Sequence, residues 1–410
     1  MANGKNSYNL SLGFLQDFSL ESPDIFELKD RYEHAYIVGK TGMGKSALME
    51  HMALHDLNRG ISVIYIDPKG ESVKKLYYLA KDKSKVHYVS IESPVVINPL
   101  HKEGYKLDNL IQEFIQILDV LITLTSSNPE STVLMREIIG MAMKSITRER
   151  NKNLEYLTNF LLYAAVRKEL KNELPAGSSE RIYWEEFDGP GSKNRIKIDC
   201  AQRVASRLLE ISNGEMRDFV IGKNELDISG IVEKGESVLV DTSRMNRNSR
   251  IYLSNLIVYA VLSYCEFAQR KQKPLLVYVD EFQIVVSDLF SDLLARSRAS
   301  RVGFTLAHQN FQQIPRDILG AVFGNVGTSI CFRCGDEEAR RFAPIFEVKA
   351  PELFNLPKYN AWIRIGTHNS LIETYPPKID EVPDIDIPKA QEIEKQDTKL
   401  DFLGDEWVNY

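Results

Sequence analysis

Gly39-Lys40-Thr41-Gly42-Met43-Gly44-Lys45-Ser46 decides how this chain folds. The stretch fits the phosphate-loop pattern G-x-x-x-x-G-K-[ST], in which glycines let backbone N–H groups turn toward phosphate oxygens. Residues 36–38 before it form an apolar run that favours a strand, and residues 47–53 after it are mostly good helix formers. The helix N-terminus would add its positive dipole end to the loop. A strand, a glycine turn and a helix in this order predict that all eight residues bind a nucleotide.

Two side chains of the loop have more specific expected roles. Lys45 is expected to reach the β and γ phosphates, and the Ser46 hydroxyl is expected to bind Mg²⁺. The alternative is a chance match to a short pattern, against which the strand and the helix on either side argue. The loop therefore predicts ATP and Mg²⁺ as the cofactors.

The apolar runs around the loop indicate an α/β fold. Residues 62–66 and 86–89 favour two further strands, and Asp67-Pro68-Lys69-Gly70 between them favours a turn. Alternation of strands and helices predicts a mostly parallel sheet with helices on both faces. Strand-like runs return later in the chain, at residues 237–240, 275–279, 303–307, 329–332 and 361–365.

The segment between these two blocks of strands has a different character. Helical periodicity covers residues 108–124, 132–148, 154–172 and 198–212, with a turn-rich break around residues 175–191. We expect an all-helical insertion, residues 105–215, in an α/β core made of residues 31–104 and 216–378. Residues 1–30 are expected to form an N-terminal edge segment, and residues 379–410 an acidic C-terminal arm.

The composition argues against several broad classes of protein. A net charge of −6 over 410 residues disfavours a broadly basic nucleic-acid coat, although not a local basic channel. The N-terminus lacks the apolar stretch of a secretory signal. The most apolar windows, 110–124 and 253–268, are interrupted by polar residues or too short for a bilayer, so both indicate buried helices. We expect a cytoplasmic protein without a transmembrane segment of its own.

Four cysteines are present, and two of them form a C-x-x-C, Cys331 and Cys334. A structural zinc site needs four ligands, and the chain offers no second such pair. The residues between the two cysteines favour a strand, which would point them to opposite faces. We therefore expect unpaired thiols rather than a metal or redox site.

A second chemical motif ends a later apolar strand. Residues 275–279 are followed directly by Asp280 and Glu281. In P-loop NTPases a carboxylate at this point holds Mg²⁺ through its water shell. An adjacent Glu can orient and deprotonate the attacking water, and such positioning supplies most of the catalysis. The alternative is a solvated acidic turn, which the phosphate loop earlier in the chain makes the weaker interpretation.

The next apolar strand, residues 303–307, leads into Gln309. Its amide could contact both the attacking water and the γ-phosphate, which would make it a sensor of the nucleotide state; the alternative is a simple loop-facing amide. Arginines cluster just before this strand, at positions 296, 298 and 301. They form either a solvated helix face or, in a ring ATPase, the source of a finger that reaches the neighbour's γ-phosphate. Arg298 is the first candidate for that finger, and Arg333 is the second.

Together these motifs resemble the FtsK–HerA class of ring ATPases, and most closely the soluble motor domain of type IV secretion (conjugative) coupling proteins. The resemblance covers about residues 31–378 and rests on the order and spacing of residues 34–46, 66–70, 98–100, 279–282, 307–309, 323–328, 332–333 and 356–359. It implies a RecA-like P-loop core with an all-helical insertion domain. It also implies an ATP-driven DNA translocase, an ATPase that works as a homohexameric ring with a relaxase or secretion component as partner.

Two other functions fit the same motifs. One is a HerA-like DNA helicase or translocase that serves DNA processing or phage defence with a nuclease partner. The other is a nucleotide-gated oligomeric scaffold that moves nothing. Coupling proteins typically carry N-terminal transmembrane helices and HerA proteins an N-terminal β-barrel; we expect neither here, so recruitment to the membrane would depend on a partner.

A motor that tracks the DNA backbone needs cations and amides rather than base-reading side chains. The basic, amide-rich residues 243–250 offer Arg244, Arg247 and Arg250 for this purpose. The alternative is a helix N-terminus with exposed arginines. A second candidate for moving along DNA is the loop 310–313, directly after Gln309.

The acidic arm ends in a segment unusually rich in large apolar residues, among them Phe402, Leu403 and Trp407. Buried aromatic residues dominate interface energetics, so the arm is expected to dock on a surface. HerA-like ATPases are known as a family for a C-terminal extension that braces the adjacent subunit, which implies the same here. The alternative is docking to a different protein.

Overall fold

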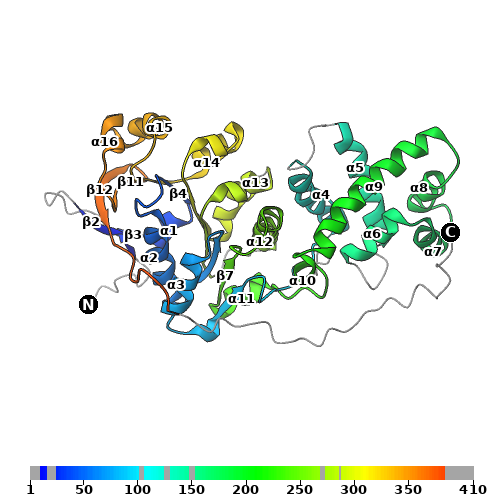
Figure 1. The fold of residues 1–410 in the computed structure, drawn as a ribbon, viewed down its shortest axis with the longest axis horizontal. Helices are drawn as coiled ribbons and strands as arrows, with labels where there is room; N and C mark the ends of the chain where they lie inside the picture. Colours follow the sequence, from blue (N-terminus) through cyan, green and yellow to red (C-terminus); the bar gives the residue numbers. More distant parts are fainter. Residues whose placement is uncertain are drawn as a thin grey trace.

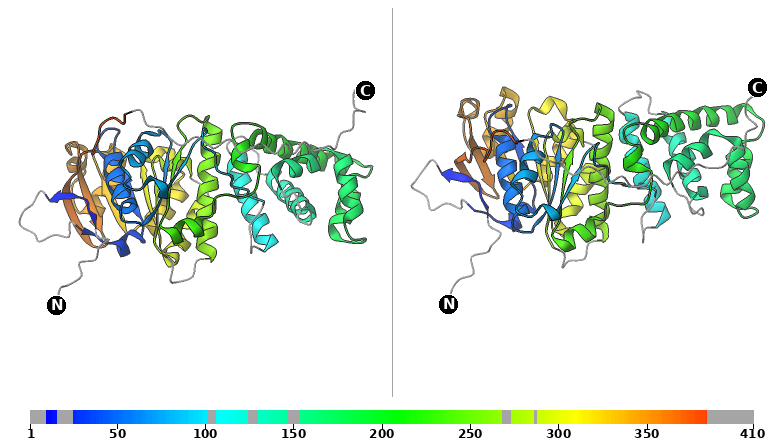
Figure 2. Two further views of the ribbon diagram at one scale, coloured as in Figure 1. Left: turned by 90° about the horizontal axis from the view of Figure 1, so that it is seen from below. Right: turned by 60° about the horizontal axis from the view of Figure 1, so that its bottom comes forward.

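The computed structural model describes residues 10–15, 25–100, 106–123, 130–146, 153–267, 273–285 and 288–383. An α/β core and a lobe of helices lie side by side along the long axis of the molecule (Figure 1). Two further views show that the lobe meets the core on one side only, next to helix α12 (Arg247–Phe267) (Figure 2).

Ten strands form the main sheet, in the order β2-β12-β11-β10-β4-β9-β8-β5-β7-β6. The seven strands from β10 to β6 run parallel, and β11, β12 and β2 add an antiparallel edge. The strands are β2 (Gly13–Leu15), β4 (Ala35–Val38), β5 (Ser62–Asp67), β6 (Val86–Val89), β7 (Ser237–Asp241), β8 (Leu275–Val279), β9 (Val302–His308), β10 (Thr328–Cys331), β11 (Asn360–Ile365) and β12 (His368–Thr374). A separate pair joins β1 (Leu10–Ser11) to β3 (Ile25–Phe26).

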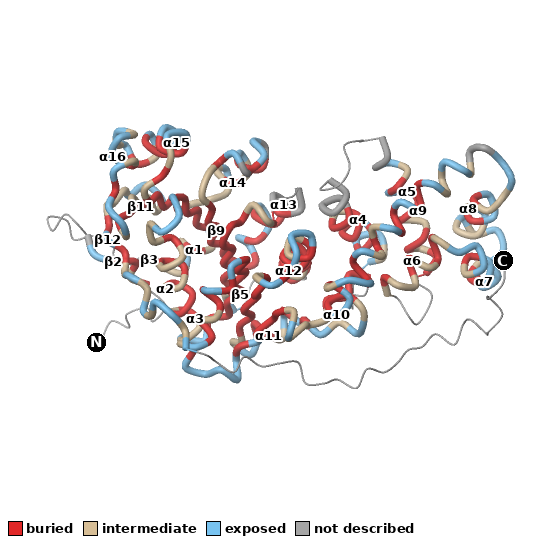
Figure 3. Tube along the Cα trace, viewed as in Figure 1, coloured by how far each residue is buried: buried red, intermediate tan, exposed pale blue. Residues whose placement is uncertain are grey.

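Helices cover both faces of the parallel strands, so that β4, β5, β8 and β9 are buried along their whole length (Figure 3). Strands buried on both faces are expected to be continuous apolar runs, which is how these segments appear in the sequence. One face packs on α2 (Lys45–Leu57) and α3 (Glu71–Leu79), and the other on α12, α13 (Asp288–Ser297), α14 (Arg316–Asn325) and α15 (Asp336–Phe346). The remaining core elements are α1 (Leu28–Arg31), α11 (Ile228–Lys234), α16 (Ala350–Phe354), η1 (Lys83–Lys85), η2 (Phe282–Ile284), η3 (Arg298–Ser300) and η4 (Phe311–Gln313).

The predicted fold class, a mostly parallel α/β sheet with a helical insertion, is confirmed. Every predicted strand is present, with ends that differ by at most one residue. Strand β12 was not predicted, because its sequence, His368–Thr374, is largely polar and its side chains are mostly exposed or half-buried. A strand of an antiparallel pair that is exposed on one side shows no continuous apolar run.

The helical lobe consists of α4 (Leu107–Thr123), α5 (Glu130–Ile146), α6 (Leu154–Leu162), α7 (Ala164–Glu173), α8 (Ser179–Phe187), α9 (Ser192–Asn213) and α10 (Arg217–Val220). The prediction of one helix over residues 154–172 is wrong. Helix α6 ends at Leu162, where Arg167 Nη1 donates hydrogen bonds to the carbonyls of Phe160 and Leu161 at 3.0 and 2.9 Å. These carbonyls lie in the last turn of α6, where backbone acceptors lack helical partners.

The expected turn-rich break around residues 175–191 also needs correction, because it contains helix α8. Ser178 caps this helix, since its hydroxyl accepts a hydrogen bond from Arg181 N at 3.3 Å. Trp184 and Phe187 on α8 are buried, and the ring of Trp184 packs on both Phe160 and Phe187. The segment 175–191, predicted as a break because of its turn-forming residues, therefore contributes apolar side chains to the core of the lobe.

The two chain segments that join the core to the lobe run side by side. Asn98 Nδ2 donates to Gly222 O at 3.1 Å, and Asn98 N donates to Asn224 Oδ1 at 3.2 Å. Ile97 N also donates to Phe219 O at 2.7 Å. Asn98, singled out in the sequence as part of an Asn-Pro-Leu motif, thus ties the entry to the lobe to its exit.

The expected N-terminal edge segment contributes β2, which pairs with β12 at the antiparallel edge of the sheet. The C-terminal arm from residue 384 onward, with its aromatic end, lies outside the described residues. Within the part of the chain that the structure describes, no helix combines the length and the apolar character needed to cross a membrane.

Candidate nucleotide site

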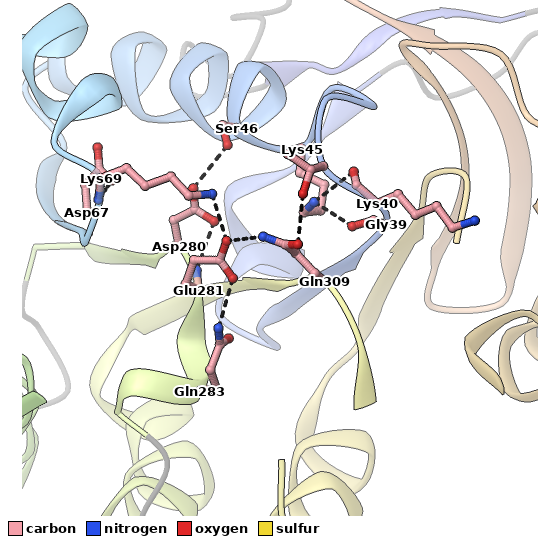
Figure 4. A network of polar contacts seen from close by, with 11 residues as sticks. Gly39, Lys40, Lys45, Ser46, Asp67, Lys69, Asp280, Glu281, Gln283 and Gln309 are labelled. Carbon is pink, nitrogen blue, oxygen red and sulfur yellow. Dashed lines mark hydrogen bonds and ion pairs between the residues drawn. The ribbon is translucent and has the colours of Figure 1, made fainter. Parts of the chain in front are cut away.

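The predicted chemical motifs meet at one edge of the sheet, where the parallel strands end (Figure 4). The phosphate loop follows β4, Gln309 follows β9, and Asp280 and Glu281 follow β8. Strand β9 lies between β4 and β8, and it therefore places Gln309 between the loop and the two carboxylates. We call this side of the sheet the carboxyl edge.

The loop is held in shape by the antiparallel side of the sheet. Gly44 has a φ of 119°, and a Cβ there would lie 2.9 Å from Tyr359 Cδ1, so both backbone and space require glycine. Tyr359 N donates to Met43 O at 2.9 Å, and Lys40 N donates to Arg333 O at 2.7 Å. Helix α2 begins at Lys45, so the helix that the sequence predicted from residues 47–53 starts inside the loop motif.

Lys45 is buried beneath the loop. Its Nζ donates to Gly39 O at 2.5 Å and to Lys40 O at 3.1 Å. Burial lowers the pKa of the ammonium, while Asp280 and Glu281 nearby act in the opposite direction. The ammonium is therefore held by two carbonyls of the loop, and its contact with the β and γ phosphates stays a prediction.

The two predicted Mg²⁺ partners lie in contact. Ser46 Oγ donates a hydrogen bond to Asp280 Oδ2 at 3.1 Å. Asp280 is only 2% exposed, and this burial raises the pKa of its carboxyl group. A hydroxyl beside a carboxylate is a set of hard oxygen donors that suits Mg²⁺, which binds through one or two protein groups and keeps several waters.

Glu281 accepts hydrogen bonds from three side chains of the site. Its Oε1 accepts from Lys69 Nζ at 2.8 Å and from the Gln309 amide, and its Oε2 accepts from Gln283 Nε2 at 2.9 Å. Burial alone would raise the pKa of this carboxyl group, but the hydrogen bonds from Lys69 and Gln283 hold it below its ordinary value. Glu281 is therefore ionised at neutral pH.

Gln309 joins the phosphate loop to Glu281. Thr41 Oγ1 donates to Gln309 Oε1 at 2.8 Å, while the other end of the same amide donates to Glu281. A change at the loop thus has a direct path to the carboxylate, as a sensor requires.

Two residues of the site, Asp67 and Lys69, were not among the predicted site residues. They follow β5, which lies beside β8, so the turn that they form belongs to the same edge. Asp67 accepts from Lys69 N and Ser72 N, each at 2.8 Å, and burial raises the pKa of its carboxyl group to about 6. The sequence signal was present as Asp67-Pro68-Lys69-Gly70 after a buried strand; it indicated a turn and formed part of the family resemblance, but neither residue was given a role in the site.

The two candidate finger arginines lie in different places. Arg298 precedes β9, at the opposite edge from the phosphate loop, and its Nη2 donates to Asn325 O. Arg333 lies beside the loop, and its Nε donates to Leu356 O at 2.6 Å. Neither contact tests a role across subunits, so both assignments stay predictions.

The arginines proposed for DNA contact follow β7 and so belong to the carboxyl edge. Their side chains differ in the contacts that they make. Arg250 donates to the carbonyls of Thr242, Ser243 and Met245 at 3.2 to 3.3 Å, which fits the alternative structural role. Arg244 pairs with Glu92 on the surface. Arg247 is exposed at the start of α12.

The prediction that Cys331 and Cys334 point to opposite faces is wrong. Strand β10 ends at Cys331, and the chain then turns, so the two sulfurs lie 3.6 Å apart. Both are buried free thiols. Nowhere in the described ranges do three or more His, Cys, Asp or Glu side chains gather as a metal site, so the pair has no further ligands there.

Comparison with protein families gives one match, to the central domain of the helicase HerA, over residues 28–261. This range is more than half of the chain. A search of curated proteins gives no match.

Several solved structures share the fold. The bacterial conjugative coupling protein TrwB, in an unbound form, has a TM-score of 0.67 at 12% identity and covers 89% of both chains. TrwB in complex with ADP and Mg²⁺ gives a TM-score of 0.65 at 14% identity, over 87% of this chain and 88% of that one. VirB4 of Thermoanaerobacter pseudethanolicus gives 0.65 at 14% identity, over 92% of this chain and 98% of that one. At such identities the likeness shows the fold.

Proposed function

The chain belongs to the family of the HerA helicase central domain, and from this premise we propose that it is an ATP-driven DNA translocase that works as a homohexameric ring. The observation that carries the proposal is the carboxyl edge itself. There a phosphate loop, a Ser46–Asp280 contact and a Glu281–Gln309–Thr41 chain of hydrogen bonds converge.

Each residue of this edge has a role in the proposed hydrolysis. Backbone N–H groups of the loop and the Lys45 ammonium bind the phosphates, and Ser46 and Asp280 would hold Mg²⁺. The metal, when bound, neutralises charge on the β and γ phosphates. Glu281 orients the attacking water and takes its proton, and Gln309 reports the state of the loop to Glu281.

Movement along DNA would involve the surface that follows β7. Arg244 and Arg247 supply exposed cations for backbone phosphates, while Arg250 holds the loop that presents them. The bound nucleotide TrwB complexes support ATP and Mg²⁺ as cofactors in general. The proposed partners are DNA, further copies of the chain, and either a relaxase or secretion component or a nuclease.

The experiment is a measurement of Mg²⁺-dependent ATP hydrolysis with and without DNA, together with the mass in solution. The proposal expects hydrolysis that DNA accelerates, a hexameric mass, and no turnover in Lys45→Ala. Hydrolysis that DNA leaves unchanged would favour the nucleotide-gated scaffold. Co-purification with a nuclease rather than a relaxase would favour the HerA-like helicase.

The finger across subunits has its own test. Arg298 lies at the opposite edge from the phosphate loop of its own chain, so any catalytic contact would have to come from a neighbour. Fingers of this kind contribute about 10³- to 10⁵-fold in rate. Mixing Arg298→Ala with Lys45→Ala chains should therefore restore part of the activity, and Arg333→Ala serves as the second candidate. Intact rings that fail to complement would argue against Arg298.

A further inference from the structure

The ion pair between Lys69 and Glu281 joins two turns that come from different strands. Lys69 Nζ lies 2.8 Å from Glu281 Oε1, across the carboxyl ends of β5 and β8 (Figure 4). The Lys69 side chain is 48% exposed, whereas that of Glu281 is 10% exposed. The cation therefore reaches the carboxylate from the solvent side of the site.

The turn that carries Lys69 is tied to a buried carboxylate. Asp67 accepts hydrogen bonds from Lys69 N and Ser72 N, so both the turn and the start of α3 are fixed to one buried carboxylate. Gly70 has a φ of 77°, and a Cβ there would lie 2.6 Å from both Asp241 Oδ1 and Ser243 Oγ. Gly70, next to Lys69, is thus packed directly on the end of β7 and on the segment that follows it.

That segment leads directly into the arginines proposed for DNA contact. Thr242 N donates to Asp67 O at 3.2 Å, and Ser243 N donates to Asp241 Oδ1 at 2.9 Å. Arg244 follows immediately. A shift of residues 243–250 on binding DNA would therefore be passed to the turn at residues 67–70 through direct packing.

Oε1 of Glu281 is closed to a water while these bonds last. Lys69 and Gln309 use both lone pairs of Oε1, and Gln283 uses one of the two lone pairs of Oε2. A general base needs a lone pair within hydrogen-bond reach of the water that it deprotonates, and release of Lys69 would free one on Oε1. Among these three partners, Lys69 alone belongs to the turn that is packed on residues 241–243.

We propose that Lys69 is a positioning residue that holds Glu281 in a resting arrangement through their ion pair, which we call the latch. DNA bound along residues 243–250 would break this ion pair and release Glu281. The inference rests on the proposed function of the same site. Ion pairs between exposed side chains shift a population by a factor of about two to five, and nearly half of the Lys69 side chain is open to water, so we expect a modest shift of the turn to open the pair.

The test compares the basal and the DNA-stimulated ATP hydrolysis rates of Lys69→Met with those of the wild-type chain. Loss of the latch should raise the basal kcat by about two- to fivefold, with KM for ATP little changed, and should shrink the stimulation by DNA by the same factor. Lys69→Arg, which keeps the cation, should behave like the wild type. Lys74→Met, on the adjacent helix α3, is the matched loss of one positive charge and should leave both rates unchanged.

The outcomes separate this inference from the proposed function. If Lys69→Met lowers the basal kcat, Lys69 assists catalysis directly and the latch is wrong. If both rates equal those of the wild type, the ion pair has no role in turnover and the latch is equally wrong. A wild-type chain that binds ATP but shows no hydrolysis with or without DNA contradicts the proposed function, and a Lys69→Met chain that is also inactive then contradicts the latch.

Discussion

The two edges of the parallel sheet each carry a polar cluster, and the two clusters differ in how far their side chains are exposed to solvent. At the carboxyl edge, four strand ends bring Lys69, Glu281, Gln309 and the phosphate loop into one network, with Lys69 half exposed. At the opposite edge, Arg31 and Asp56 form an ion pair whose side chains are 2% and 0% exposed. Tyr278 completes this second cluster by a hydrogen bond to Asp56 at 2.6 Å.

The difference indicates what each cluster is for. Arg31 and Asp56 join α1 to the end of the phosphate-loop helix α2, and both side chains are buried. Removing one partner of such a pair leaves an uncompensated buried charge. The network at the carboxyl edge instead joins groups that can exchange their partners for phosphate, water or metal. We infer that one edge fixes the fold and the other performs the chemistry.

The largest expected effect at the carboxyl edge comes from Glu281→Gln. The substitution keeps the shape of the side chain but removes the base, and general bases contribute about 10²- to 10⁴-fold. Turnover should fall by that factor, while ATP stays bound with wild-type affinity. Steady-state hydrolysis and equilibrium binding measured on the same sample check both parts. A rate near that of the wild type would make Asp280 and Glu281 a structural pair.

This contrast also shows which parts of the site could be predicted from sequence. The phosphate loop, Asp280–Glu281 and Gln309 are short local patterns beside buried strands, so the sequence alone indicated them. The role of Lys69 depends on β5 lying beside β8, although the two strands are far apart in the chain. Without that neighbour relation, residues 67–70 indicated a turn and matched a family motif, but they gave no sign of contact with Glu281.

The opposite edge could not be predicted for the same reason. Arg31 lies 25 residues from Asp56 and 247 from Tyr278, and no local pattern links them. The fold class was predictable because continuous apolar runs mark strands that are buried on both faces. The error at Cys331 and Cys334 arose at a strand end, where one residue decides whether alternation continues or the chain turns.

At the opposite edge, Asp56→Asn should destabilise the protein without impairing the chemistry. It leaves the Arg31 charge buried and unpaired, which costs about 3–5 kcal/mol in the free energy of unfolding. Chemical denaturation measures this loss, and kcat of the folded fraction should stay near that of the wild type. Glu27→Gln breaks the exposed pair with Lys29 and is the matched control, with no measurable change expected. Equal effects of the two substitutions would contradict the assignment.

A smaller effect is expected at His34, also at the opposite edge. Burial lowers the pKa of this histidine to about 4, from 6.5, and its Nδ1 accepts a hydrogen bond from Phe304 N at 3.1 Å. Between pH 6.5 and 4 the unfolded chain binds a proton that the folded chain does not, so stability falls as the pH falls. The loss is at most about 3 kcal/mol.

His34→Gln should flatten this part of the stability curve, because glutamine does not titrate. Denaturation at pH 7 and at pH 4.5, for both proteins, gives the difference. The comparison must be made between variant and wild type, because Asp67 titrates in the same pH range. The pKa of its carboxyl group is raised to about 6, so its contribution lowers the free energy of unfolding as the pH rises from 4 to 6, opposite to the effect of His34. Parallel curves for the two proteins would mean that His34 takes no part.

The central claim, that the carboxyl edge is the nucleotide site, is tested most directly by equilibrium binding of ATP in the presence of Mg²⁺. The wild-type chain should bind one ATP per chain, and Lys45→Ala should weaken binding by about 10- to 100-fold, because a hydrogen bond from a charged group to phosphate is lost. Lys40→Ala is the control from the same loop, since the Lys40 ammonium points away from Lys45 and Glu281 (Figure 4). Binding by Lys45→Ala that matches the wild type would contradict the account.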